Sequence, residues 1–470
     1  MNSARGKELQ DYPETNVPPP AERSAEMPML WDEGHRSLID ACVRYESLLE
    51  LFLQLKKLAD VLDDNQTMKE NEFPVFSTVN ALRHYDWTMC ELLHSMSVEV
   101  VRSIVKNTFA FDVTNGNIEP FRLPSALLDE RTPGVYVVGI KTKGHGGQFL
   151  NMNELEVLIR DMKLYVEGYE AYARHNGWAS ANMTTAERRA ISMVNAIESH
   201  CGSQRVQNDG PMFIEKAEEV PRIRALIKTF EGMCDRSLDP TGRVNISQSP
   251  LYVGCSKDLN KRMAVYNNRN VKNINKPLAL TVCILRKQNR GPELVSGCVL
   301  RILREQQLPM AEQLVCTIAG SLVYQHGFNA VEAGGTGYQS LPTAAGLKEN
   351  IKYIVCGTRV LINNLKESLD EVDLRKRFLS LLDQASGEIV RLKEILKRCE
   401  DEVQNLPSGV DFDQVLSDIS SVVQSVRRNL KDKREALEFW QLMLEIQNII
   451  IDETGLGLHL IDHTKDGTRA

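Results

Sequence analysis

One segment constrains this 470-residue chain more than any other: "SPLYVGCSKDLNKRMAVY", residues 249–266. Its apolar residues 251–254 favour a β-strand. Residues 256–259 are typical of a helix start, and Lys261 and Arg262 fall on the first turns of that helix. We therefore expect a strand that ends at a glycine and leads into a basic helix. The unit is either an ordinary βα connection or a place where backbone and arginine converge on a phosphate.

Composition limits the classes of protein that the chain can belong to. It is 42% apolar and 25% charged with a net charge of -7, which is typical of a soluble globular protein. The ten cysteines are scattered and never form C-x-x-C, as expected for reduced thiols inside a cell. The N-terminus lacks an apolar signal-peptide core, and no run of eighteen apolar residues follows. We expect an intracellular protein of the nucleus or cytoplasm that is neither secreted nor in a membrane.

Changes in pattern along the chain indicate five regions. Apolar residues three and four positions apart predict helices near the N-terminus, and heptads containing Ile389, Leu392 and Leu396 predict a C-terminal helical hairpin or coiled coil. The predicted regions are a disordered tail at 1–27, a helical region at 28–120, a mixed α/β domain at 121–366, the hairpin at 367–455 and a tail at 456–470.

The mixed domain is expected to alternate strands and helices. The run "TPGVYVVGIKTKGHGGQF" predicts a strand that ends in a glycine-rich turn. A helical insertion follows at about 148–246, where Thr184 and Glu187 form a capping-box pattern and Pro221 suits the first turn of a helix. The later elements are predicted as strands at 249–254 and 278–286, helices at 297–308 and 311–326, and a strand at 353–362.

Positive charge is concentrated between residues 249 and 306. This stretch holds eleven basic and three acidic residues, a net charge of +8 in a chain of net charge -7. A local excess of this size attracts a polyanion. The alternative is a basic helix face that only contacts solvent.

Five polar positions occur in an order that resembles the GIY-YIG nuclease superfamily. Gly134–Val135–Tyr136 and "YVG" at 252–254 match its two strand motifs, and Arg262 follows on the next helix. Tyr266 lies where many members carry histidine or another polar ring. Glu312 and Asn329 match the beginning and the end of the closing segment "AEQLVCTIAGSLVYQHGFN". The resemblance covers about 134–141 and 248–330.

The resemblance implies a fold and an activity. The fold would be α+β: a small GIY-YIG-like mixed sheet split by the helical insertion, with N-terminal helices and the C-terminal hairpin beside it. The activity would be metal-dependent hydrolysis of phosphodiester bonds. Glu312 would bind Mg²⁺ or Mn²⁺, Arg262 would hold the phosphoryl oxygens, Tyr136 would position or deprotonate the attacking water, Tyr252 would assist it, and Asn329 would tie the site together.

Nucleic acid is the partner that this hypothesis requires, with DNA preferred over RNA. The residues expected to bind it are Lys257, Lys261, Arg269 and Lys272. The C-terminal helices offer a surface for a protein partner or for self-association.

The chain departs from the family in one respect: 115 residues separate Tyr136 from Tyr252, where the family usually has a short hairpin. Folded insertions are tolerated because loop-closure entropy rises slowly with length. We therefore expect the two tyrosines on adjacent antiparallel strands. The alternative is an inactive GIY-YIG fold that binds nucleic acid or acts as a scaffold or regulatory protein.

Overall fold

The computed structural model describes residues 33–55, 87–122, 133–202, 210–267, 270–302, 307–331, 359–405, 414, 417–426 and 428. Contacts divide the chain into two compact units, Met1–Glu367 and Ser368–Ala470. The predicted tails at 1–27 and 456–470 lie outside the described residues, as does Arg269. Within the described ranges, no helix is long and apolar enough to cross a membrane.

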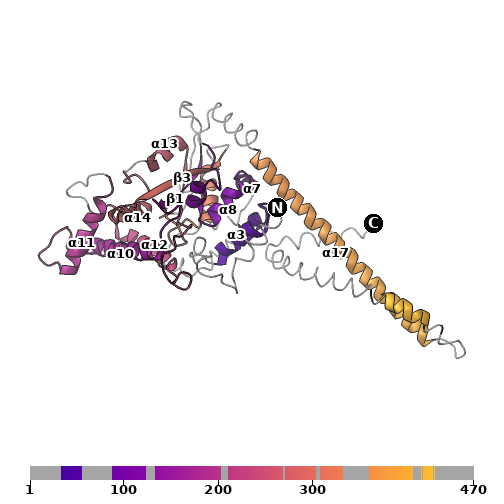
Figure 1. Cartoon of the computed structure of the whole chain (residues 1–470). Coiled ribbons are helices and arrows are strands. Elements are labelled where there is room, and N and C mark those ends of the chain that lie inside the picture. Colours follow the sequence, from indigo (N-terminus) through magenta and orange to yellow (C-terminus); the bar gives the residue numbers. More distant parts are fainter. Residues whose placement is uncertain are drawn as a thin grey trace. The chain divides into compact units, whose positions relative to one another are not determined.

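The first unit combines helices with a small antiparallel sheet, consistent with the α+β class (Figure 1). Its N-terminal part is helical, as predicted, and it packs against β1 through α9 and against α15 through α7 and α8. These elements are α3 (Glu33–Arg44), a short helix at 49–55, α7 (Trp87–His94), α8 (Val98–Val105) and α9 (Phe109–Asn115).

The sheet has three strands in the order β2-β1-β3, and β1 lies antiparallel to both neighbours. Tyr136 pairs with Gly254, and Val138 pairs with Tyr252. The predicted adjacency of the two tyrosine strands is therefore confirmed despite the long sequence between them. The strands are β1 (Gly134–Thr142), β2 (Tyr252–Ser256) and β3 (Pro292–Arg301).

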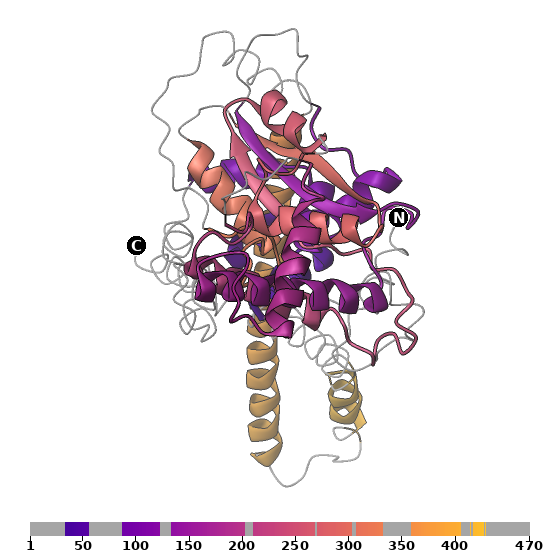
Figure 2. The ribbon, with the colours of Figure 1, turned by 90° about the vertical axis from the view of Figure 1, so that its left-hand side faces the viewer.

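The insertion leaves and rejoins the sheet at one place. The Phe149 amide donates to the Ile246 carbonyl over 2.7 Å, and the Ile246 amide donates to the Leu150 carbonyl over 3.1 Å. A folded insertion with joined ends adds little to the entropy cost of pairing β1 with β2. Figure 2 shows its helices gathered to one side of the strands. They are α10 (Met152–His175), α11 (Thr185–Glu198), the 3-10 turn η1 (Ala217–Glu219) and α12 (Val220–Gly232).

Local sequence signals set the starts of these helices. Thr184 and Glu187 form the predicted capping box of α11, and Asn151 and Glu154 form a second one at α10. Pro221 occupies the first turn of α12, also as predicted. The helical prediction for the insertion is confirmed.

Two predictions after β2 were wrong. The apolar run expected as a strand at 278–286 is a helix, α14 (Lys276–Lys287), which Asn275 caps by accepting the Leu278 amide. Most residues of α14 are buried on every side of the helix. The sequence is therefore a continuous apolar run without the helical period of an amphipathic helix, and it cannot be told from a buried strand. Residues 297–301 of the expected helix at 297–308 belong instead to strand β3, residues 303–306 lie outside the described residues, and the next helix, α15 (Leu308–Ala319), begins at 308.

The remaining elements also differ from expectation. Helix α15 begins before the predicted 311 and ends at Gly320, whose φ of 54° is the left-handed conformation that glycine readily adopts at a helix end. Residues 353–358 of the predicted last strand lie outside the described residues, and 360–362 are helical. These three residues begin α17 (Val360–Gln404), which contains the predicted heptads.

Two short elements lie between β2 and α14. They are α13 (Leu259–Ala264) and the 3-10 turn η2 (Val265–Asn267).

Ion pairs attach the insertion to α14. Asp161 of α10 is fully buried and accepts hydrogen bonds from Lys287 at 2.9 Å, Gln288 at 3.0 Å and Arg160 at 3.0 Å. Arg290, which follows α14, binds Glu154 of α10. Burial acts to raise the pKa of Asp161, but these hydrogen bonds outweigh it and hold the pKa below its ordinary value.

We expect Asp161→Ala to lower the free energy of unfolding by about 3 kcal/mol, because it leaves Lys287 in a largely buried place without its carboxylate. The contribution of Asp161 should be complete above its unfolded pKa of about 4 and should disappear as pH falls through the lower folded value. Urea unfolding of both proteins, at neutral and acidic pH, measures this. The matched control is Glu170→Ala on the same helix, whose pair with Arg224 is exposed and should contribute at most about 1 kcal/mol.

Candidate functional site

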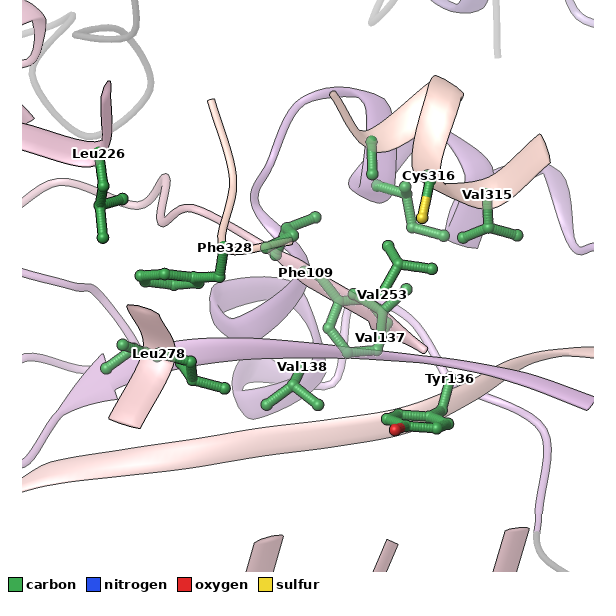
Figure 3. Close-up of a cluster of buried hydrophobic side chains, with 14 of the residues drawn as sticks. Phe109, Tyr136, Val137, Val138, Leu226, Val253, Leu278, Val315, Cys316 and Phe328 are labelled. Carbon is green, nitrogen blue, oxygen red and sulfur yellow. The ribbon is translucent and has the colours of Figure 1, made fainter. Parts of the chain in front are cut away.

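Side chains of the paired strands alternate between the two faces of the sheet. Val137 and Val253 point towards Val315 and Cys316 of α15, whereas Tyr136 lies on the opposite side of β1 (Figure 3). The paired residue Gly254 faces the Tyr136 ring, and a Cβ at position 254 would lie 2.5 Å from its hydroxyl. Glycine is therefore required at 254 by the close approach of the tyrosine.

Arg262 is held by the hydroxyl of Tyr136. Its Nε donates to that oxygen over 2.8 Å, and the Tyr136 and Tyr266 hydroxyls lie 3.1 Å apart. Asp258 caps the start of α13 by accepting the Lys261 amide, which directs the helix so that Arg262 reaches back to the sheet. The guanidinium carbon also lies 5.8 Å from the centre of the Tyr266 ring.

Three tyrosine rings surround this arginine. The Tyr136 ring lies 6.2 Å from Tyr252 and 5.6 Å from Tyr266, measured between ring centres. Tyr136 has no exposed surface and Tyr266 is 4% exposed, while Tyr252 and Arg262 are half-buried. We call Tyr136, Tyr252, Arg262 and Tyr266 the Arg262 cluster. Solvent therefore reaches this cluster through Tyr252 and Arg262.

Burial sets the protonation states of the cluster. It raises the pKa of all three tyrosines well above the ordinary value of 10, and charge repulsion from a neighbouring phenol acts in the same direction, whereas the positive charge of Arg262 acts to lower these pKa values. Burial opposes the charge on Arg262, but the nearby phenolic oxygens outweigh it and raise the pKa of the guanidinium. At neutral pH the cluster thus consists of three neutral phenols and one cation.

Glu312 and Asn329 bind the edge of β2 that faces away from β1. Glu312 Oε1 accepts the Cys255 amide over 3.1 Å. The side-chain amide of Asn329 accepts from the Val253 amide over 2.9 Å and donates to the Val253 carbonyl over 2.8 Å. These side chains supply hydrogen bonds that a fourth strand would otherwise make.

The five predicted catalytic residues lie in two places around β2. Tyr136, Tyr252 and Arg262 belong to the Arg262 cluster. Glu312 and Asn329 bind the outer edge of β2. Glu312 lies in the second turn of α15, not in the first turn as the sequence suggested. Asn329 is 6% exposed and therefore belongs to the supporting structure of the site. The metal prediction depends on Glu312 alone, because the described residues contain no group of three or more His, Cys, Asp or Glu side chains placed to hold an ion.

The basic residues divide into two groups. Lys261 and Lys272 are exposed and Lys257 is half-buried, so these three predicted nucleic-acid contacts are accessible. Lys276, Lys287 and Arg290 instead form ion pairs with acidic residues of the insertion, and Arg301 is only 2% exposed. The +8 excess of the sequence therefore overstates the positive charge of the surface.

Two parts of the site were not among the predicted site residues. Tyr266 was noticed only by its spacing from Arg262, and the structure adds its hydroxyl contact with Tyr136. The Cys255 amide, which orients Glu312, had no signal in the sequence, because backbone groups carry none.

Comparison with known proteins adds no relative: a scan against protein-family models, a search of curated proteins and a search of solved structures each found no match.

We expect Gly254→Ala to displace the Tyr136 ring and to break its bond with Arg262, since the new methyl group would overlap the hydroxyl. Overpacking of this kind typically costs about 1–3 kcal/mol. Thermal and urea unfolding measure the loss. Gly177→Ala is the matched control, because the nearest atom to its added Cβ is 4.0 Å away, and it should change stability by less than about 0.5 kcal/mol. Equal stability of the two variants would show that the Gly254–Tyr136 approach is not tight.

Proposed function

We propose that this chain is a metal-dependent endonuclease of the GIY-YIG type that hydrolyses phosphodiester bonds in DNA. The observation that supports it most is the pairing of the two tyrosine strands, which places Tyr136 and Tyr252 beside Arg262 although 115 residues separate them in sequence. A chance occurrence of the short motifs would not require these strands to be neighbours.

Arg262 would bind the phosphate. Tyr136 occupies its Nε, and the half-buried arginine side chain remains partly accessible to solvent. A guanidinium fixed in this way offers paired donors to two phosphoryl oxygens, which a lysine cannot reproduce. Because the arginine is oriented before substrate binds, little reorganisation is needed as negative charge develops on the phosphoryl group.

Glu312 would hold the metal ion. Carboxylate oxygens are hard ligands that suit Mg²⁺ or Mn²⁺, and the bond from the Cys255 amide fixes the orientation of this carboxylate. A bound ion supplies charge neutralisation and lowers the pKa of a coordinated water. With a single carboxylate from the described residues, the remaining ligands would be waters and substrate phosphate.

The tyrosines would position groups without acting as bases. Their raised pKa values keep them protonated at neutral pH, so deprotonation of water by Tyr136, which the sequence left open, is disfavoured. Tyr136 contacts Arg262 from a fully buried position, and Tyr252 is the most exposed tyrosine of the Arg262 cluster. We assign Tyr136 to orienting the arginine and Tyr252 to contact with substrate or water.

A second candidate function is that of an inactive fold that binds nucleic acid or a protein partner. The observation that favours it is that Glu312 and Asn329 both bond the β2 backbone and thus have a structural role without any chemistry. Substitutions that keep the hydrogen bonds and remove the charge separate the two functions.

Glu312→Gln is the sharpest such substitution. Glutamine retains an oxygen that accepts the Cys255 amide, so folding should be preserved, but it has no negative charge for a divalent cation. We expect Mg²⁺- or Mn²⁺-dependent nicking of plasmid DNA by the wild type and none by Glu312→Gln, with equal melting temperatures. Glu293→Gln on β3, an exposed carboxylate paired with Lys141, is the control and should retain activity.

Arg262→Ala, compared with Lys261→Ala next to it, tests the phosphate contact. The first should reduce the nicking rate by about 10²–10³-fold, as expected for loss of one preorganised charge-stabilising group. The second should mainly weaken binding, and the affinity of the wild type should fall steeply with salt. If wild type and Glu312→Gln are equally inactive on plasmid and on RNA substrates, the endonuclease proposal is wrong; salt-dependent binding would then favour the inactive fold.

A further inference from the structure

Two buried cysteines from different parts of the first unit lie in contact with each other. Cys201 follows α11 in the insertion, Cys283 lies in α14, and neither side chain has exposed surface. The Cys283 thiol donates a hydrogen bond to the Cys201 sulfur. The two residues are 82 positions apart in sequence, so this contact joins the insertion to the part of the chain that follows β2.

Backbone hydrogen bonds hold the two thiols beside each other. The Val271 amide donates to the Cys201 carbonyl over 3.1 Å, and the Arg286 side chain donates to the His200 carbonyl over 3.2 Å. Val271 and Arg286 lie on either side of Cys283 in the sequence, so residues 200 and 201 are bound at three points to the segment that contains it. Groups held together in this way react with each other far faster than the same groups free in solution.

We propose that Cys201 and Cys283 form a disulfide when the protein meets a peroxide, and that this bond fastens the end of α11 to α14. Cys201 lies directly beneath the surface, because both of its chain neighbours, His200 and Gly202, are exposed. Local opening just after the helix therefore brings the oxidant to its sulfur. The bond forms only on oxidation and is opened again by a reducing thiol.

The hydrogen bond between the sulfurs assigns the order of the steps. The bond to Cys201, together with burial, raises the pKa of Cys283, so this thiol stays protonated and remains the donor. A donated hydrogen bond favours negative charge on the accepting sulfur, and the thiolate is the reactive form of cysteine. Cys201 is therefore the nucleophile.

Two steps convert the thiols and one molecule of hydrogen peroxide into the disulfide and two molecules of water. The Cys201 thiolate attacks a peroxide oxygen: an S–O bond forms, the O–O bond breaks, and the leaving hydroxide takes up the proton that Cys201 released. The Cys283 sulfur then attacks the Cys201 sulfur: the S–S bond forms, the S–O bond breaks, and the hydroxyl group leaves as water with the Cys283 proton.

Peptide mapping of the full-length chain tests the proposal. The reduced protein is treated with hydrogen peroxide, its remaining free thiols are alkylated, and the unreduced digest is analysed by mass spectrometry. A peptide pair linked through Cys201 and Cys283 should appear, lighter by two hydrogens than the separate reduced peptides, and dithiothreitol should remove it. Cys201→Ala and Cys283→Ala should each abolish this pair, whereas Cys298→Ala, which changes a buried cysteine on β3, should leave it unchanged.

Hydrogen exchange then measures whether the bond fastens the insertion. Oxidation should slow exchange of the Val271 amide by at least about tenfold in the wild type, because that amide donates to Cys201, and should have no such effect in Cys283→Ala. Melting temperatures of the reduced proteins confirm that the variants are folded. The proposal is overturned if the folded wild type gives no Cys201–Cys283 linkage, if Cys201 stops at a sulfenic acid or links to another cysteine, or if Val271 exchanges equally fast in the linked and the reduced protein.

Discussion

The hydrogen bonds along the outer edge of β2 join parts of the first unit that are far apart in sequence. On one side β2 pairs with β1, and on the other its Val253 and Cys255 amides donate to Asn329 and Glu312. Backbone amides of an edge strand need partners and attract other strands when left exposed. By meeting this need with side chains, the fold fixes a carboxylate and an amide beside the tyrosine strands.

The position of Arg262, on the face of the sheet opposite α15, also depends on β2. Because Gly254 has no side chain, the Tyr136 ring can approach β2, and its hydroxyl then fixes Arg262. The insertion does not disturb this arrangement, since its two ends are bonded to each other and its helix α10 is held by ion pairs to α14 and Arg290. The long sequence between the tyrosines therefore does not prevent β1 and β2 from pairing.

Much of this arrangement could be predicted from sequence because its signals are local. The strand of Tyr136, the capping boxes and the glycine after Tyr252 each follow from a few adjacent residues. Helix α14 could not be recognised, because it is buried on nearly all sides and has no polar face to reveal its period. The bonds of Glu312 and Asn329 join residues 57 and 76 positions apart, and no pattern in a single sequence states such pairings.

Residue-resolved hydrogen exchange of the Val253 and Cys255 amides tests the account of the β2 edge most directly. Both amides should be protected in the wild type although they face away from β1. Glu312→Ala should accelerate exchange at Cys255 by at least about tenfold, the equivalent of a lost hydrogen bond to a charged group, and should affect Val253 less. Glu312→Gln should keep both protected. Fast exchange at both amides in the wild type, or unchanged exchange at Cys255 in Glu312→Ala, would contradict the account.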